Sequence, residues 1–99
     1  MEKRVYEVTT NELFGIEVTS VLVLEIYENN ISMETGKLGQ IIMIYDSEIE
    51  SDDLPYGYFV PYKEKNGFSI DDVIKQYYHD VASEDTIILE IKQLTSIWV

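Results

Sequence analysis

Apolar residues follow a strand-type pattern through the first two thirds of this sequence, whereas residues 69–82 have the period of a helix. Apolar and polar residues alternate at 6–8 and 14–18, and branched residues run through 21–26 and 41–45. Both patterns are typical of a pleated sheet. The length allows one modest core, so we expect a single domain over the whole chain, 1–99. The expected fold is α+β, a mostly antiparallel sheet of about five or six strands with one amphipathic helix packed on one face.

The helix is expected from about Ser69 to Ala82. Ser69 can cap its first turn, and Asp72 is the reciprocal partner three residues later. Asp71 and Asp72 also lie at the positive end of the helix dipole. Apolar residues recur at the spacing of one buried stripe: Ile70, Val73, Ile74, Tyr77, Tyr78 and Val81. The stripe predicts that this helix packs against the sheet.

Turn residues and a proline indicate how the strands are arranged. Asn29-Asn30 is expected to form a hairpin turn, because asparagine tolerates a positive φ. The run 41–45 is apolar throughout, which predicts a central strand. Pro61 removes a backbone donor, so the strand at 56–62 is expected at an edge of the sheet.

Residues 9–18 allow two interpretations. Thr9-Thr10-Asn11-Glu12 could be a capping box that opens a short helix. Gly15 and the branched residues after it favour a strand. We expect strand here.

The end of the chain is unusually apolar. A last strand is expected over residues 86–92. Its inward side chains are expected to be Ile87, Leu89 and Ile91. Chain ends usually fray and expose polar residues, so this end is expected to be docked, either in its own sheet or against a second copy. The predicted dimer or docking patch consists of Leu94, Ile97 and Trp98.

The chain is strongly acidic. It has 19 Asp and Glu residues against 7 Lys and Arg residues, and its formal net charge is −12 at pH 7. Between Val5 and Tyr62 the one base is Lys37. Such a field repels nucleic acid and anionic membranes and attracts cationic partners. We therefore expect a basic protein as partner, with no direct nucleic-acid or membrane binding.

The sequence offers little support for catalysis. It has no cysteine, and its one histidine, His79, lies at ordinary helical spacing from Asp71 and Lys75. The glycines are scattered singly and form no phosphate-binding loop. We therefore expect no enzyme activity, no cofactor and no metal. The absence of cysteine and of a secretory segment favours a cytoplasmic protein.

Acids are most concentrated in the stretch from Asp46 to Asp53. If this stretch continues the preceding strand, alternate side chains share one face at a spacing of about 6.6 to 6.8 Å. The expected partner-binding acids are Asp46, Glu48, Glu50, Asp52 and Asp53, joined by Asp71 and Asp72 at the helix start. Their charge density could approach that of a DNA strand, which has one charge per roughly 3.4 Å. A solvated loop is the alternative interpretation.

Tyrosines indicate a second possible contact surface. Tyr58 and Tyr62 lie on the expected edge strand, and tyrosine is enriched at protein interfaces because it offers a large area at low entropy cost. We therefore include both in the expected partner-binding residues. A second core layer would give the same pattern in the sequence.

In its size, its acidity and its Asp46–Asp53 stretch, the chain resembles phage-encoded DNA mimics that disarm host proteins such as histone-like proteins, restriction enzymes, CRISPR effectors and RNA polymerase. Uracil-DNA glycosylase inhibitors and acidic immunity proteins against nuclease toxins share these gross features. The resemblance implies a non-catalytic inhibitor, often dimeric, that occupies the DNA-binding surface of a basic host protein. The alternative is an immunity-like or assembly module that binds through the Tyr56–Tyr62 edge or the C-terminal patch.

Overall fold

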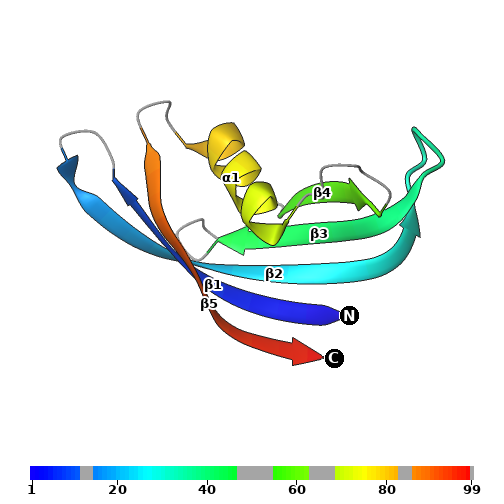
Figure 1. Ribbon diagram of the computed structural model, residues 1–99, viewed down its shortest axis with the longest axis horizontal. Helices are drawn as coiled ribbons and strands as arrows, with labels where there is room; N and C mark the ends of the chain where they lie inside the picture. Colours follow the sequence, from blue (N-terminus) through cyan, green and yellow to red (C-terminus); the bar gives the residue numbers. More distant parts are fainter. Residues whose placement is uncertain (12–14, 47–54, 63–68, 83–85, 99) are drawn as a thin grey trace.

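The structure is a computed structural model that describes residues 1–11, 15–46, 55–62, 69–82 and 86–98. Within these residues the elements are β1 (Glu2–Asn11), β2 (Glu17–Ile31), β3 (Leu38–Asp46), β4 (Tyr56–Pro61), α1 (Ile70–Val81) and β5 (Ile87–Trp98). The five described strands form one antiparallel sheet in the order β4-β3-β2-β1-β5. The helix lies on one face of this sheet (Figure 1), which confirms the expected α+β fold.

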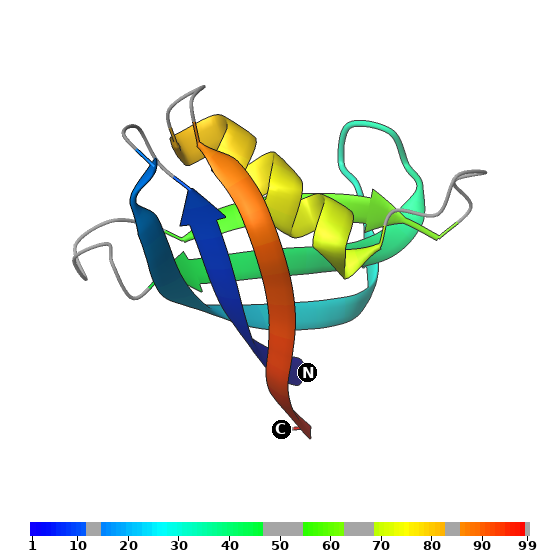
Figure 2. The ribbon, with the colours of Figure 1, turned by 60° about the vertical axis from the view of Figure 1, so that its left-hand side comes forward.

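The sheet brings the two ends of the chain together. β5 pairs with β1 from Glu2 opposite Trp98 to Asn11 opposite Ile87, so the termini lie side by side at one end of the sheet (Figures 1 and 2). β4 and β5 are the outer strands of the described sheet, and β2 is its middle strand. This arrangement confirms the edge position predicted for β4 and the interior position predicted for β3.

The core lies between α1 and the sheet. Along β1 to β4 every second side chain points to the helix, as the two-residue period of a strand requires. The buried apolar side chains are Tyr6, Val8, Leu22, Leu24, Ile26, Ile42, Ile44, Val60, Val73, Ile74 and Tyr77. Because only alternate residues enter this core, half of each apolar run in β2 and β3 points to the opposite face.

The helix agrees with the sequence prediction. Ser69 is its N-cap, and the backbone and side chain of Ser69 and Asp72 complete the capping box. Ala82 is the C-cap. Ile70, Tyr78 and Val81 pack against the core as partly buried side chains, so the predicted stripe is the one that meets the sheet.

The expected hairpin turn at Asn29-Asn30 is wrong. β2 continues to Ile31, and the chain reverses at residues 32–37, where the Gly36 amide donates to the Ser32 carbonyl over 2.8 Å. Asn29 does have a positive φ of 56°, but at an irregularity in the β2–β3 pairing between Tyr27 and Asn30. Asn29 therefore adopts its positive φ in a β-bulge within the hairpin and not in the turn.

The expected limits of the last strand are also wrong, and its expected facing is confirmed only at Ile91. β5 extends to Trp98, and Ile87 and Leu89 are exposed, whereas Ile88 and Ile91 pack on the core. The register shift against β1 at Leu89 explains the difference, because it inserts one extra residue into β5 and resets the alternation.

Residues 9–18 are strand at both ends. β1 includes residues up to Asn11 and β2 begins at Glu17, while Gly15 and Ile16 belong to neither strand. The expected strand is therefore confirmed at residues 9–11 and 17–18, and it is wrong at residues 15–16.

Candidate interaction surfaces

The predicted row of acids is described only at its first residue. Asp46 ends β3 and is half-buried beneath α1, where the Tyr77 hydroxyl donates to its Oδ2 over 2.9 Å. Burial, and then this hydrogen bond, raise the pKa of Tyr77. Glu48, Glu50, Asp52 and Asp53 lie outside the described residues. Asp46 itself thus fixes the helix to the sheet.

The two acids at the helix start have different surroundings. The Asp72 carboxylate accepts the Ser69 amide over 3.1 Å and the Ser69 hydroxyl over 3.0 Å. The Ser69 amide lowers the pKa of Asp72, and the hydroxyl adds to the effect. Asp71 is exposed. Asp72 therefore caps the helix, and Asp71 is the acid that α1 presents to solvent here.

Both tyrosines predicted as contact residues use their hydroxyls inside the fold. Tyr58 in β4 donates to Asp80 of α1 over 2.7 Å and is half-buried. Burial, and then the hydrogen bond to Asp80, raise the pKa of Tyr58. Tyr62 donates to Glu28 and accepts the Asn29 amide over 2.9 Å. The Tyr58 contact connects β4 to α1, and the Tyr62 contacts connect the residue after β4 to β2. Both hydroxyls therefore already have hydrogen-bond partners within the fold.

Tyrosine–carboxylate pairing is a feature that the sequence reasoning missed. The described pairs are Tyr27 with Glu25, Tyr58 with Asp80, Tyr62 with Glu28, and Tyr77 with Asp46. The only signal in the sequence was composition, eight tyrosines beside 7 Lys and Arg residues. Pairs between strands or between sheet and helix depend on the tertiary arrangement, so their partners could not be read from spacing.

Two of the described bases are also engaged. The Arg4 Nε atom donates to Glu2 over 2.7 Å, and the Ser96 hydroxyl donates to the same carboxylate over 2.6 Å. Arg4 and then Ser96 hold the pKa of Glu2 below its usual value. Lys3 forms an ion pair with Glu25 at 3.6 Å. These bases are neutralised locally and are not available to bind an anion.

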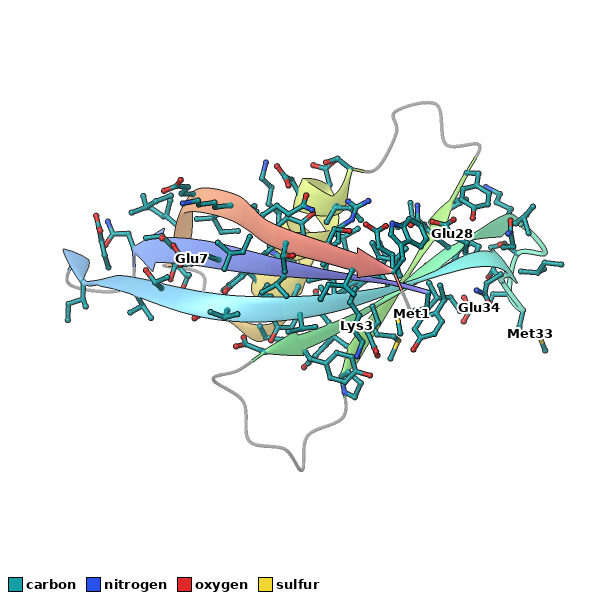
Figure 3. All side chains as sticks on the ribbon, turned by 90° about the horizontal axis from the view of Figure 1, so that it is seen from below. Met1, Lys3, Glu7, Glu28, Met33 and Glu34 are labelled. Carbon is teal, nitrogen blue, oxygen red and sulfur yellow. The ribbon has the colours of Figure 1, made fainter. Side chains whose placement is uncertain are left out.

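The face of the sheet opposite α1 is apolar. We call it the open face, and it consists of Val5, Val21, Val23, Tyr27, Ile41, Met43, Tyr45 and Phe59. The strand registers place Val5, Val23 and Tyr45 in one row across three strands, and Tyr27, Ile41 and Phe59 in another. Figure 3 views this side of the sheet, with α1 behind it. Val21 is 36% exposed and Tyr45 42%, and no described element covers them.

Charges lie mainly around the open face. The Lys3–Glu25 pair lies within it. Glu7 is opposite Val21, and Glu17 lies at the start of β2, beyond the Thr9–Thr19 pair. An apolar centre with a polar rim is the usual anatomy of a protein interface.

The predicted C-terminal patch lies on β5. Its backbone pairs with β1 in the sheet, which is one of the two arrangements that we expected. Its side chains remain exposed, at 47% for Leu94, 54% for Ile97 and 71% for Trp98. Ile97 is opposite Lys3 and lies on the open side, whereas Trp98 is opposite Glu2 and lies on the other side of the sheet.

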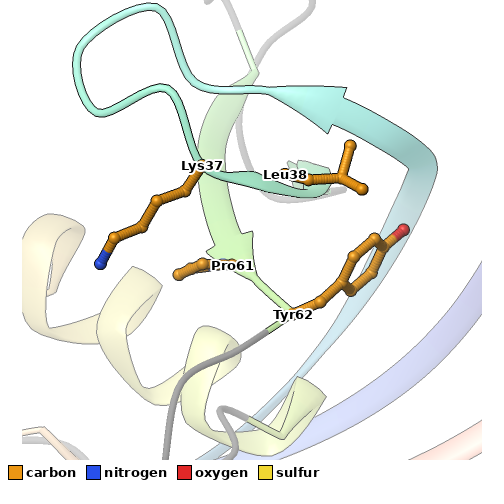
Figure 4. Close-up of a pocket in the computed structure, with 4 residues that line it drawn as sticks. All are labelled: Lys37, Leu38, Pro61 and Tyr62. Carbon is orange, nitrogen blue, oxygen red and sulfur yellow. The ribbon is translucent and has the colours of Figure 1, made fainter.

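A surface pocket of about 400 Å³ lies beside the β2–β3 hairpin (Figure 4). Lys37, Leu38, Pro61 and Tyr62 line it. Lys37 is the sole ammonium among these four, and Tyr62 is bonded to Glu28. These four described residues therefore offer no pair of groups for acid–base chemistry.

Further comparisons add no function. Among the described residues no cluster of His, Cys, Asp and Glu could hold a metal ion, and no helix is long and apolar enough to span a membrane. Comparison of the chain with protein-family models, curated proteins and solved structures gave no match. The surfaces and the charge of the protein are therefore the features that bear on its function.

Proposed function

We propose that this protein is a non-catalytic binding protein whose open face docks on another protein. The observation that supports this is that both faces of the sheet are mostly apolar, although the open face also contains the Lys3–Glu25 pair. Strands that are apolar on both faces normally have a cover on each side, whereas an antiparallel sheet with one wet face alternates with polar residues. Helix α1 covers one face, and Val5, Val23 and Ile41 on the other face lack a described cover.

The charge of the chain favours a basic partner. The net charge is −12, and a field of this sign accelerates encounter with cationic proteins. Around the open face, Glu7 and Glu17 can pair with Lys or Arg side chains of that partner. The apolar centre would then supply affinity, and the acids would supply orientation and rate.

Polar substitution of the open face tests this proposal. The double variant Val21→Gln and Tyr45→Gln changes no formal charge and uses exposed positions. Immobilised wild-type protein should retain one or more basic proteins from a bacterial lysate, and the double variant should retain them about tenfold less. Met33→Gln is the matched control, because Met33 is fully exposed at the hairpin tip. Equal retention by the double variant and the wild type would contradict the proposal.

Inhibition of a nucleic-acid-binding protein is the more specific form of this proposal. The observation that favours it is the acid excess, together with the local neutralisation of Lys3 and Arg4 by Glu25 and Glu2. In this form the carboxylates replace DNA phosphates on the DNA-binding surface of a histone-like protein, a nuclease or a polymerase.

Competition with duplex DNA tests this specific form. Binding to a bacterial histone-like protein should be lost when duplex DNA is added, and also in the triple variant Glu48→Lys, Glu50→Lys and Asp52→Lys. Binding that persists with duplex DNA present would exclude the mimic and leave docking by the open face intact.

A further inference from the structure

The outer side of β5 is a long edge without a described neighbour. β5 has 12 residues and is the last strand of the described sheet. The opposite edge strand, β4, has six residues and ends at Pro61. A long edge presents unpaired backbone donors and acceptors that favour pairing with another strand. Pro61 removes one backbone donor at the end of β4, whereas β5 contains no proline.

From this edge we infer that β5 pairs antiparallel with β5 of a second copy, about a two-fold axis at Ile91. The inference goes beyond the proposed function, because it concerns the edge of the sheet and not its open face. Such a pairing would join two sheets into one continuous sheet with isologous symmetry.

The bulges limit where the two strands can pair. The register shifts against β1 occur at Leu89 and Leu94, and the segment 90–93 between them pairs regularly with β1. Bulges bend an edge and hinder its pairing with a long flat strand. The regular segment is therefore where a second strand fits.

The period of the strand then restricts the register. A two-fold axis normal to the sheet keeps each side chain on its own face, so residues directly opposite each other must share a face. Within the segment 90–93 this condition requires the axis to pass through a residue. An axis between two residues would place a core-side residue such as Ile91 opposite an open-side residue such as Lys92.

Charge selects among the remaining registers. Glu90 and Lys92 are both exposed and lie on the open side, opposite Thr9 and Glu7 of β1. An axis at Glu90 or at Lys92 would place two like charges directly opposite each other, which is destabilising. An axis at Gln93 would place Lys92 opposite Leu94, which lies at a bulge outside the regular segment. An axis at Ile91 places Glu90 of each copy opposite Lys92 of the other, which forms two opposite-charge pairs.

Charge exchange tests the inference, with sedimentation velocity at about 0.15 M NaCl as the readout. Wild-type protein should be dimeric at micromolar concentration. Glu90→Lys alone or Lys92→Glu alone creates two like-charge pairs and should raise the dimer dissociation constant about tenfold or more. The double variant Glu90→Lys and Lys92→Glu restores opposite charges and should return the constant to within about threefold of wild type.

The matched controls are single charge reversals of the same size at the distant β2–β3 hairpin. Glu34→Lys and Lys37→Glu are exposed there and should leave the dimer intact. Circular dichroism would verify that each variant is folded. A monomeric wild type, a dimer unaffected by the single reversals, or a double variant that stays monomeric would each overturn the inference.

A second measurement does not depend on charge reversal. Because the chain has no cysteine, Glu90→Cys and Lys92→Cys each introduce a single thiol. An oxidised mixture of the two variants should form disulfide-linked heterodimers, because these positions are directly opposite each other. Cross-linking that is no greater in the mixture than in either variant alone would overturn the register. The open-face variant Val21→Gln with Tyr45→Gln should still dimerise, which separates this result from the test of function.

Discussion

Single hydroxyls and carboxylates connect the elements of this acidic fold. In most proteins Lys and Arg neutralise buried or half-buried acids, but here they are outnumbered 19 to 7. A phenol donor takes their place at the half-buried Asp46, and phenols also donate to the exposed carboxylates of Asp80 and Glu28. A hydrogen bond to a charged group contributes more than one between neutral groups. Three of the eight tyrosines therefore have a structural role for their hydroxyls within the fold itself.

Removal of the Tyr77 hydroxyl should measure the contribution of one such pair. Tyr77→Phe keeps the buried ring but loses the bond to Asp46, so we expect the free energy of unfolding at pH 7 to fall by about 1 to 2 kcal/mol. Urea denaturation would measure the change. Tyr56→Phe is the control, because the Tyr56 ring packs edge-on against Tyr77 and its hydroxyl has no described hydrogen-bond partner.

The Tyr77–Asp46 pair also makes the free energy of unfolding depend on pH in the alkaline range. Folding raises the pKa of Tyr77 above the value of about 10 expected for an unfolded chain. The unfolded state therefore releases the proton first, and the stabilisation is complete below pH 10 and is lost as the pH rises above it. Tyr77→Phe should show a shallower loss of stability between pH 9 and about pH 11. An unchanged slope would show that Tyr77 does not contribute to the alkaline transition.

Residue positions in the candidate site were only partly predictable. The sequence placed Tyr58 on an edge strand correctly and Tyr62 one residue too far, since β4 ends at Pro61, but it did not show that Asp80 and Glu28 would accept their hydroxyls. Those acceptors are 22 and 34 residues away in the sequence. Local periodicity contains no information about such distant partners.

At the level of the elements, the pairing of β3 with β4 depends on a close approach of two backbones. Gly39 lies opposite Pro61, and a Cβ atom at Gly39 would contact the Val60 carbonyl oxygen and come within 2.8 Å of the Pro61 Cα atom. Backbone atoms cannot move aside as a flexible side chain can. Gly39→Ala should therefore lower the free energy of unfolding by about 2 kcal/mol, as overpacking does.

Gly57 provides the matched control in the same pair of strands. A Cβ atom there would meet the Met43 sulfur at 3.1 Å, and that flexible side chain can rearrange. Gly57→Ala should leave the midpoint of urea denaturation nearly unchanged, while Gly39→Ala should lower it. Equal midpoints for the two variants would show that the β3–β4 spacing relaxes at little cost.

The elements also show how far local sequence rules extend. The predicted helix, residues 69–82, includes α1 and both of its caps, because the apolar period and the capping box point to the same limits. The facing of β5 was wrong at Ile87 and Leu89 because a bulge at Leu89 interrupts its alternation. The hairpin turn was misplaced because Asn29 adopts its positive φ at a bulge. Bulges depend on the partner strand, so a single strand's pattern does not reveal them.

The whole molecule keeps a large excess of acids even when the ion pairs and the tyrosine–carboxylate hydrogen bonds are taken into account. Glu7, Glu17 and Glu34 are polar surface residues to which the structure assigns no hydrogen bond or ion pair among the described residues. A folded domain with this excess repels itself, since folding brings like charges closer together. The same field would steer a basic partner toward the protein. Stability and partner binding should therefore respond to salt in opposite directions.

Thermal unfolding as a function of salt measures this repulsion. Between about 0.01 and 0.15 M NaCl the screening length falls from about 30 to 8 Å, and the melting temperature should rise by roughly 5 °C, the shift that about 1 kcal/mol produces in a domain of this size. The triple variant Glu7→Gln, Glu17→Gln and Glu34→Gln should start from a higher melting temperature and gain less from salt. A melting temperature that falls with salt would mean that the ion pairs of Lys3 and Arg4 outweigh the repulsion. Electrostatic attraction of a basic partner would then have no physical basis.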